Sequence, residues 1–189
     1  MARAGLTADR LAAAGAALAD EHGFDQVTAS ALARHFDVQV ASLYSHVRNS
    51  DDLKTRIATL ALTELADQAA GAVAGRAGAD ALSALADVYR SYAHQHPGRY
   101  TASRYLPPTS PDTAHVAAGK RHSELMRAVL RAYDLDEPAE TDAVRLLGSV
   151  IHGYVSLELA GSFSYSRPDS ADSWPRILAA LDNLLRTWS

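Results

Sequence analysis

Apolar residues recur every three or four positions along almost the whole chain, and this helical spacing constrains the fold more than any other feature of the sequence. The pattern is clearest in the last segment, Trp174 to Trp188. Stretches in which apolar and polar residues alternate strictly are missing, while alanine, the strongest helix former, is abundant. We therefore predict an all-α protein. With 189 residues, 48% of them hydrophobic, the chain is long enough to bury a substantial core.

The bulk composition excludes several classes of protein. The chain has no cysteine, which excludes disulfides, thiolate zinc sites and cysteine nucleophiles. Asp9 and Arg10 interrupt the N-terminal apolar run, and no segment approaches eighteen uncharged apolar residues. We therefore expect a cytoplasmic protein without a membrane span. The net charge of -4 argues against a surface that binds nucleic acid non-specifically, so any such contact must be local.

The N-terminal part of the chain predicts a helix-turn-helix. A first helix from Leu6 to His22 begins at a capping Thr7, and Thr28 opens a second helix that ends near Asp37. A short third helix is expected from Val40 to His46. Two short helices joined by a tight turn and packed on a longer one form a helix-turn-helix, in which the second helix of the pair is the candidate for DNA recognition.

A long fourth helix follows directly. Asn49 or Ser50 caps it, and two aspartates occupy its first turn, where carboxylates interact favourably with the helix dipole. The residues just before it have two interpretations. Tyr44 and His46 are either a core aromatic and an ordinary surface residue, or donors that fix a recognition helix on DNA phosphates.

Two helices of the second half have apolar faces that need a partner. The segment 141–161 is apolar on two sides, which predicts a helix sandwiched between neighbours. The stripe of the last helix either buries against its own domain or pairs with the same helices of a second chain about a two-fold axis. The residues assigned to such a dimer interface are Ile151, Val155, Ile177, Leu181, Leu184, Leu185 and Trp188.

About the first 60 residues resemble the DNA-binding domain of the tetracycline-repressor (TetR) family of transcriptional regulators. The resemblance rests on the helix start Leu6 to Ala19 and on the runs GFDQVTASALARHFDV at 23–38 and SLYSHVRNSDDL at 42–53. The runs HPGRY at 96–100 and IHGYVSLELAGSF at 151–163 resemble a subgroup whose C-terminal domain is named for a Trp-His-Gly signature, although the Trp is missing here. The resemblance implies a DNA-binding domain at residues 1–48 and a helical effector-binding and dimerisation domain at 49–189.

The resemblance also implies which residues contact DNA. The small residues of 40–45 fall at base-reading positions of the family, whereas Tyr44 and His46 match positions that touch the phosphate backbone. Ser50 stands where relatives often have a lysine, so that Arg48 is the nearest cation. The implied DNA-binding residues are Thr28, Ser30, Val40, Ala41, Ser42, Tyr44, Ser45, His46, Arg48 and Ser50.

Three features of this region depart from the family pattern. Ser30 and Ser50 stand at positions that are often basic in relatives. Asp37 stands where the turn commonly has glycine, which predicts an aspartate in the left-handed conformation. Between Val27 and Arg56 there are four basic and three acidic residues, a net charge of +1. Because phosphate contacts supply most of the affinity for DNA, we expect modest binding at physiological salt.

Amphipathic rings are concentrated in the second half of the chain. Each of them alone is as well explained by a place in the core or on the surface, but as a set they suit a mostly apolar cavity with a few polar groups. We therefore expect an aromatic or otherwise lipophilic effector. The candidate residues are Tyr89, Tyr92, His96, Tyr100, Tyr105, His122, Met126, His152, Tyr154 and Phe163.

The histidines of this half do not predict a metal site. His152 and Glu158 are six positions apart and do not share a helix face. His115 and His122 do share one, but they lack further ligands at suitable spacing.

The pattern as a whole predicts a ligand-responsive regulator rather than an enzyme. Gly-rich phosphate loops, G-x-S-x-G and paired catalytic carboxylates are absent from the sequence. We expect a homodimeric repressor that binds a palindromic double-stranded DNA operator and is released by a small-molecule effector, without a cofactor, a metal or a membrane. The alternatives are a helical ligand-binding protein without operator recognition and an enzyme built on a helical bundle.

Overall fold

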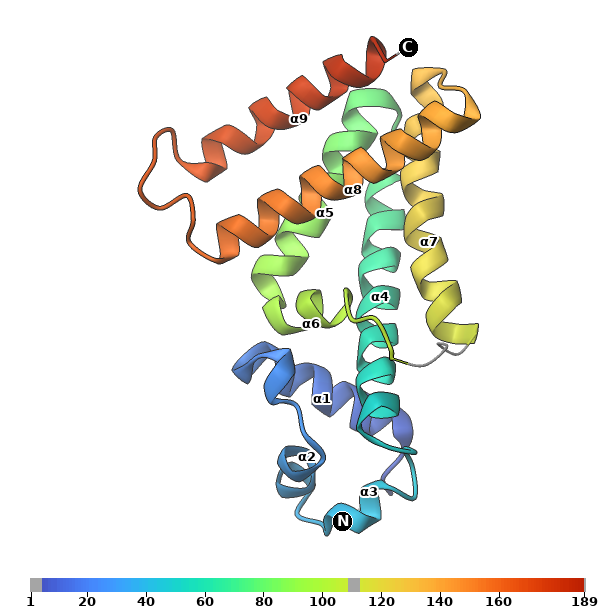
Figure 1. The fold of residues 1–189 in the computed structure, drawn as a ribbon, viewed down its shortest axis with the longest axis vertical. Helices are drawn as coiled ribbons and strands as arrows, with labels where there is room; N and C mark the ends of the chain where they lie inside the picture. Colours follow the sequence, from blue (N-terminus) through green and yellow to red (C-terminus); the bar gives the residue numbers. More distant parts are fainter. Residues whose placement is uncertain (1–4, 109–112, 189) are drawn as a thin grey trace. The chain divides into compact units, whose positions relative to one another are not determined.

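The computed structural model describes residues 5–108 and 113–188, and every regular element in them is helical (Figure 1). The α-helices are α1 (Ala8–His22), α2 (Ala29–Phe36), α3 (Val40–Leu43), α4 (Ser50–Val73), α5 (Gly78–Gln95), α6 (Pro97–Ala102), α7 (Thr113–Leu130), α8 (Glu137–Leu159) and α9 (Ser170–Arg186). Two short 3₁₀ turns, Phe24–Gln26 and Arg131–Tyr133, complete the described elements. The prediction of an all-α chain is confirmed. None of the described helices is long and apolar enough to span a membrane.

The helices pack into two compact units. Unit 1 comprises Met1–Glu64 and Gln95–Gly119, and unit 2 comprises Leu65–His94 and Lys120–Ser189. The helices α4 and α7 contribute residues to both. This division is based on how the helices pack. The predicted boundary at residue 48 instead separates a DNA-binding part from an effector-binding part, and it stays a prediction.

Unit 1 is built around a core to which α1, α2, α3 and α4 all contribute. Thr7 caps α1 as predicted, since its hydroxyl accepts a hydrogen bond from Arg10 N at 3.2 Å. Leu11, Leu32 and Ile57 are fully buried and belong to one hydrophobic cluster, together with residues of α3 and of the chain just after it. The long α4 therefore shares its core with the helix-turn-helix.

The sequence did not predict α6. The pair Pro97-Gly98 by itself predicts only the end of a helix, but α5 ends at Gln95 and a new helix begins at Pro97. A Cβ atom on Gly98 would lie 2.0 Å from the carbonyl carbon and oxygen of Ala19, so only glycine lets α6 approach the end of α1 this closely. This backbone contact fixes α6 within unit 1.

Ion pairs reinforce the contact between α6 and α1. The Asp20 carboxylate of α1 accepts a hydrogen bond from Arg99 N at 2.9 Å and lies 3.1 Å from both Arg99 Nε and His96 Nδ1. Arg99 also reaches Glu64 of α4 at 3.1 Å. One partly buried arginine thus ties three helices of unit 1 together.

Unit 2 contains the second core. Leu82, Tyr89 and Tyr92 of α5 are buried, as are Leu147 of α8 and Leu185 of α9. Figure 1 shows α8 and α9 as consecutive helices joined by the loop 160–169. The buried stripes of these helices confirm the helical spacing predicted for this half.

Two details of the helices in this half differ from what the sequence predicts. The run DLDEPAE at 134–140 predicts a break between helices, but the break is shorter, because Asp136 caps α8 by accepting a hydrogen bond from Ala139 N at 2.9 Å, which starts the helix at Glu137. The apolar side chain of Val116 predicts an inward position, but Val116 is 52% exposed, because the buried face of α7 at this point carries His115 and Ala118 instead.

Candidate functional site

The start of α2 has the geometry expected of a helix N-terminus that approaches phosphate. Thr28 has an extended backbone (φ -121°, ψ 158°), and its hydroxyl accepts a hydrogen bond from Ala31 N at 3.1 Å. Thr28 and Ser30 are both exposed. The first N–H groups of a helix lack intrahelical partners and carry partial positive charge, so they can bind an anion here.

The turn after α2 depends on an unusual backbone conformation. Asp37 adopts the left-handed conformation (φ 52°, ψ 52°), which confirms the prediction for this position. Its N–H donates to carbonyls of the last turn of α2, and Val38 N donates to Ala33 O at 3.0 Å. These bonds close the helix end and redirect the chain into α3.

The candidate recognition helix is shorter than predicted. α3 ends at Leu43, and residues 44–46 form a turn rather than the last turn of a helix. Leu43 and Val47 are buried at 1% and 3% exposure and anchor the segment on the core of unit 1. The orientation of α3 is therefore set by its apolar side, as the sequence suggested.

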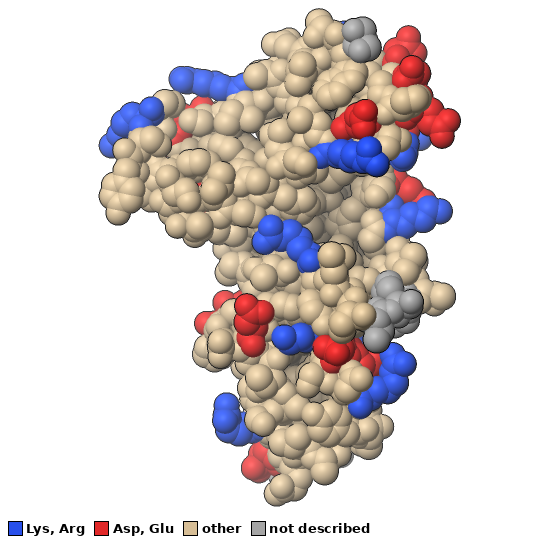
Figure 2. Space-filling model, viewed as in Figure 1, with Lys and Arg blue, Asp and Glu red and all other residues tan. Residues whose placement is uncertain are grey.

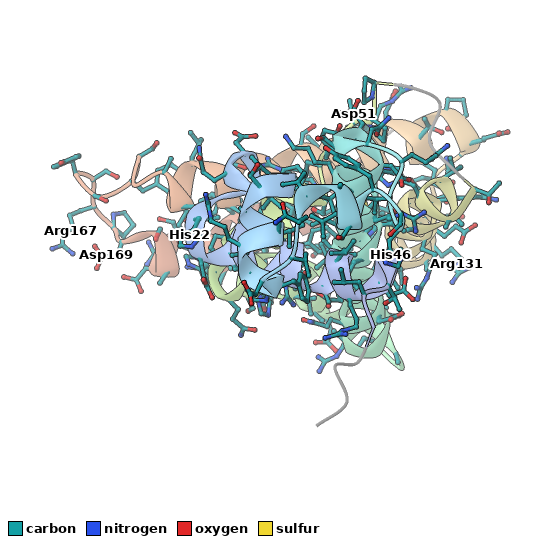
Figure 3. All side chains as sticks on the ribbon, turned by 90° about the horizontal axis from the view of Figure 1, so that it is seen from below. His22, His46, Asp51, Arg131, Arg167 and Asp169 are labelled. Atoms are coloured by element: carbon teal, nitrogen blue, oxygen red, sulfur yellow. The ribbon has the colours of Figure 1, made fainter. Side chains whose placement is uncertain are left out.

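The opposite side of this segment is open to solvent. Tyr44 is 46% exposed, which excludes its interpretation as a core aromatic. Ala41, Ser42 and Ser45 are exposed as well, while Val40 and His46 are partly buried. The Ser45 hydroxyl donates to Ser42 O at 2.7 Å, so its proton is engaged within the segment. Figure 3 looks at this end of unit 1 and labels His46 just after α3 and Asp51 at the start of α4.

Two side-chain hydrogen bonds hold the start of α4. Asn49 Oδ1 accepts from Asp52 N at 2.8 Å, and Asp52 Oδ2 accepts from Arg48 N at 2.9 Å. Asn49 is therefore the cap of α4, rather than Ser50. Ser50 is exposed at the first position of the helix.

Two arginines converge on the same carboxylate. Arg48 and Arg56 lie 3.2 and 3.3 Å from Asp52, whose side chain is 5% exposed. Burial raises the pKa of Asp52, but the hydrogen bonds from Arg48 and Arg56 outweigh burial and lower the pKa below its ordinary value. The Arg48 side chain is 81% exposed, and a surface ion pair of this kind is weak. Arg48 can therefore exchange Asp52 for a phosphate at little cost.

Basic side chains are sparse around the candidate recognition segment. On the face shown in Figure 2, the surface over α2 and α3 at the lower end is mostly uncharged. This agrees with the net charge of +1 counted for residues 27–56. Binding to DNA through this surface must rely on few phosphate contacts.

The ten effector candidates do not form one group in the structure. His96, Tyr100 and Tyr105 belong to unit 1, and the other seven belong to unit 2. Tyr100 is fully buried, and burial raises the pKa of its phenol to about 12. Tyr105 packs edge-to-face on Phe24, with ring centroids 5.6 Å apart. Together with the Asp20 contact of His96, these positions show that the three residues take part in the packing of unit 1.

Within unit 2, the rings of two candidates lie against the buried ring of a third. Tyr89 is 1% exposed, and its ring lies 5.7 Å from His122 and 5.6 Å from His152, centroid to centroid. The Tyr89 hydroxyl is hydrogen-bonded to His122 Nδ1. Tyr92 and Met126 are also buried in this unit, at 1% and 6% exposure. This part of unit 2 has the mixture of rings and polar groups expected of an effector site.

The two remaining candidates form a second cluster. Tyr154 lies 4.9 Å from Phe163 and 4.9 Å from Trp174, centroid to centroid, and its hydroxyl donates to Ser170 O at 2.7 Å. Trp174 in turn donates from Nε1 to Asp87 at 2.7 Å. Tyr154 and Phe163 thus help to hold the start of α9 in place.

A partly buried ion pair next to this cluster was missed by sequence reasoning. Arg90 Nε and Nη2 bind the two oxygens of Glu158 at 2.8 and 2.7 Å, and His94 Nε2 lies 2.9 Å from the same carboxylate. The hydrogen bonds from Arg90 lower the pKa of Glu158 to about 2, against an opposing effect of burial. Arg90 and Glu158 are 68 positions apart, so no local pattern could have paired them.

The predicted dimer residues are divided by the structure into buried and accessible positions. Ile151, Val155, Leu181 and Leu185 are at most 5% exposed within the chain itself, so they pack in the core of unit 2. Leu184 is 47% exposed, and Ile177 and Trp188 are partly buried. The second apolar side of α8 also remains accessible, with Leu157 at 49% exposure and Leu146 and Val150 partly buried.

Among the residues that the structure describes, no group of three or more histidine and carboxylate side chains is placed to hold a metal ion. His115 instead bonds the Thr59 hydroxyl at 3.1 Å.

The fold and this site define an all-helical protein with an N-terminal helix-turn-helix. Residues 82–181 match the tetracycline repressor-like C-terminal domain family. The chain therefore belongs to the tetracycline repressor (TetR) family of helix-turn-helix transcriptional regulators, which is not a family of enzymes.

Two relatives support this assignment at the level of sequence. An uncharacterised HTH-type transcriptional regulator of Mycobacterium tuberculosis, Rv0681, is 36% identical over 142 residues, which cover 75% of this chain. The match spans 65% of that relative's length, slightly less than two thirds. The uncharacterised regulator YobS of Bacillus subtilis is 29% identical over 82% of this chain and 80% of its own length.

Solved structures show the same fold at low identity. Apo ActR from Streptomyces coelicolor has a TM-score of 0.71 with 19% identity, over 98% of this chain and 97% of its own. A tetracycline repressor variant from Acinetobacter baumannii in complex with minocycline has a TM-score of 0.72 with 20% identity, over 98% and 99%. The Trp-His-Gly subgroup stays a prediction.

Proposed function

We propose that the protein is a cytoplasmic homodimeric repressor that binds a palindromic operator and is released by a small lipophilic or aromatic effector. DNA contacts are assigned to Thr28 and Ser30 of the α2 start, to residues 40–46, and to Arg48 and Ser50. The effector is assigned to unit 2.

The observation that carries the proposal is the two-sided character of α3. Leu43 and Val47 are buried, while Ala41, Ser42, Tyr44 and neighbouring Ser45 are exposed. A narrow face of small side chains can enter the major groove, which is about 12 Å wide, and an exposed tyrosine beside it can donate to a phosphate.

The apolar surface of unit 2 supports the dimer. Leu157 of α8 and Leu184 of α9 are each about half exposed, although both belong to helices whose other faces are buried. Burying such side chains against a second copy removes apolar area from water, and a two-fold axis would place the same patch on both partners. Two copies then present two recognition segments to a palindrome.

The rings of unit 2 support the effector. Tyr89, His122 and His152 offer stacking surfaces together with ring nitrogens and a hydroxyl. Two proteins of similar fold have been solved with small molecules, the Acinetobacter baumannii repressor variant with minocycline and ActR with (S)-DNPA. By reciprocity, an effector that binds the DNA-free state more tightly weakens operator binding by the same factor.

Selection from random duplex DNA at low salt tests the proposal. Wild type, Tyr44→Ala and Tyr165→Ala are run in parallel, because Tyr165 is a fully exposed tyrosine in unit 2 and serves as a matched control. Wild type and Tyr165→Ala should enrich one palindrome, and Tyr44→Ala should enrich the same palindrome less strongly. If wild type enriches nothing, the alternative of a ligand-binding protein without operator recognition replaces the proposal.

A further inference from the structure

A cavity of about 310 Å³ lies within unit 1, away from the recognition segment. Its lining residues come from α1, from α4 and from the first turn of α7. None of its lining residues belongs to the effector candidates or to the DNA-binding residues named above. The volume is at the lower end of the range for small-molecule sites, so an occupant must be small.

Part of the wall is apolar. Ala12 of α1, Leu60 of α4 and Ala114 of α7 line the cavity. Ala12 is buried and Leu60 partly buried, whereas Ala114 is exposed at the rim. This side of the cavity can accept an aliphatic or aromatic group.

The cavity also carries one charge of each sign. Arg56 uses Nε for Asp52 at 3.3 Å, and among the described residues its terminal nitrogens have no further hydrogen-bond partner. Asp9 is exposed in the first turn of α1, and within the described ranges its carboxylate accepts no hydrogen bond. A guanidinium end and a carboxylate are thus both available to an occupant.

Two hydroxyls complete the polar lining. Thr59 Oγ1 and Thr63 Oγ1 donate their protons to the carbonyl oxygens four residues earlier, at 2.7 and 2.8 Å. With their protons used in this way, the hydroxyls can offer only lone pairs to the cavity, and Thr59 Oγ1 is also hydrogen-bonded to His115 Nδ1 at 3.1 Å. Thr63 Oγ1 is therefore the acceptor that is more available to an occupant. Acceptors of this kind favour a ligand that has N–H groups, and they would not solvate a second carboxylate.

We propose that this cavity binds a small zwitterion with an apolar side chain, of the size of a single amino acid. The carboxylate binds the terminal nitrogens of Arg56, the ammonium group binds Asp9 and the Thr63 hydroxyl, and the side chain packs on Leu60 and Ala114. A simple anion would face Asp9, and a simple cation would face Arg56, so only a molecule with both charges satisfies the site. The site does not depend on DNA binding and is tested without DNA.

Isothermal titration calorimetry of the full chain with L-leucine and L-phenylalanine is the test. Isocaproate and isoamylamine, which lack the ammonium and the carboxylate of leucine, serve as ligand controls. We expect binding of at least one amino acid, and binding of each analogue weaker by about tenfold or more, because each analogue lacks one of the two charge-assisted contacts with the site.

Protein variants then locate the site. Arg56→Gln and Asp9→Asn should each weaken amino-acid binding by about tenfold, and Ala114→Phe should abolish it by filling the cavity from its rim. Asp25→Asn, which alters an exposed carboxylate outside the cavity, is the control and should bind normally. Thermal melts of each variant confirm that it is folded.

Three outcomes would overturn the proposal. They are no binding of either amino acid at millimolar concentration, equal binding of leucine and its two analogues, and unchanged affinity in the folded Ala114→Phe variant.

Discussion

Replacing Gly98 by alanine would force α6 away from α1. The added Cβ would lie 2.0 Å from the carbonyl carbon and oxygen of Ala19 and 2.5 Å from Asp20 N. These are backbone atoms of a helix, which cannot rotate aside as a side chain can. The hydrogen bond from Arg99 N to Asp20 and the adjacent ion pairs would be strained by the same displacement.

The expected loss follows from the size of this clash. Overpacking a core typically costs 1–3 kcal/mol, and a contact with rigid backbone belongs at the upper end, so we expect Gly98→Ala to lower the free energy of unfolding by about 3 kcal/mol. For a chain of this length, 1 kcal/mol corresponds to roughly 2–4 °C, so the melting temperature should fall by roughly 6–12 °C.

Gly119 provides a matched control in the same unit. It lies in α7, and a Cβ built on it meets nothing within 4 Å. Since alanine is the better helix former, Gly119→Ala should raise the free energy of unfolding by about 0.5–1 kcal/mol. Urea denaturation and differential scanning calorimetry measure both variants. If Gly98→Ala proved as stable as wild type, the close packing of α6 on α1 would be refuted.

Three further changes test other parts of the structure. Thr28→Ala removes the cap of α2 and should lower the free energy of unfolding by about 1 kcal/mol in urea; an unchanged midpoint would contradict the capping role. Glu158→Gln weakens the pair with Arg90. Because the pKa of Glu158 is lowered from 4.5 to about 2 in the folded protein, this pair stabilises the fold above pH 4.5 and is lost as the pH falls toward 2. The stability difference between wild type and Glu158→Gln should therefore be smaller at pH 3 than at pH 7, and a constant difference would contradict the pairing. Leu157→Glu combined with Leu184→Glu alters only exposed positions and should give folded monomers by light scattering, whereas a stable dimer would place the interface elsewhere.

Local features of the fold could be predicted from the sequence because their hydrogen bonds span only a few residues. Thr7 and Thr28 cap helices through backbone N–H groups three positions away, and Asp37 closes α2 with bonds of similar range. Leu43 and Val47 are four positions apart, a spacing that likewise predicts a shared apolar side, and both are buried beside the exposed face of α3. These contacts define most of the candidate DNA interface.

Contacts between distant segments could not be predicted. Gly98 meets Ala19, and Arg90 meets Glu158, across separations at which no periodicity or cap applies. The apolar stripe of α9 predicted that one face of this helix must be buried, but it did not show which surface covers that face. In the structure, Leu181 is buried within its own unit. The place of His96, Tyr100 and Tyr105 in unit 1 could not be predicted either, because it also depends on contacts with distant parts of the sequence.

The central claim is that α3 reads bases through its small residues while Tyr44 contacts phosphate. The most direct test is to measure which bases each variant prefers in the operator. Using the selected operator and all its single-base variants, the affinities of wild type, Tyr44→Ala and Ser42→Ala are compared at one salt concentration. The account predicts that Tyr44→Ala weakens binding to every sequence by a similar factor, whereas Ser42→Ala changes which base is preferred at one position of each half-site. The opposite pattern, with base preference altered by Tyr44→Ala and uniform weakening by Ser42→Ala, would contradict the orientation of α3 on DNA.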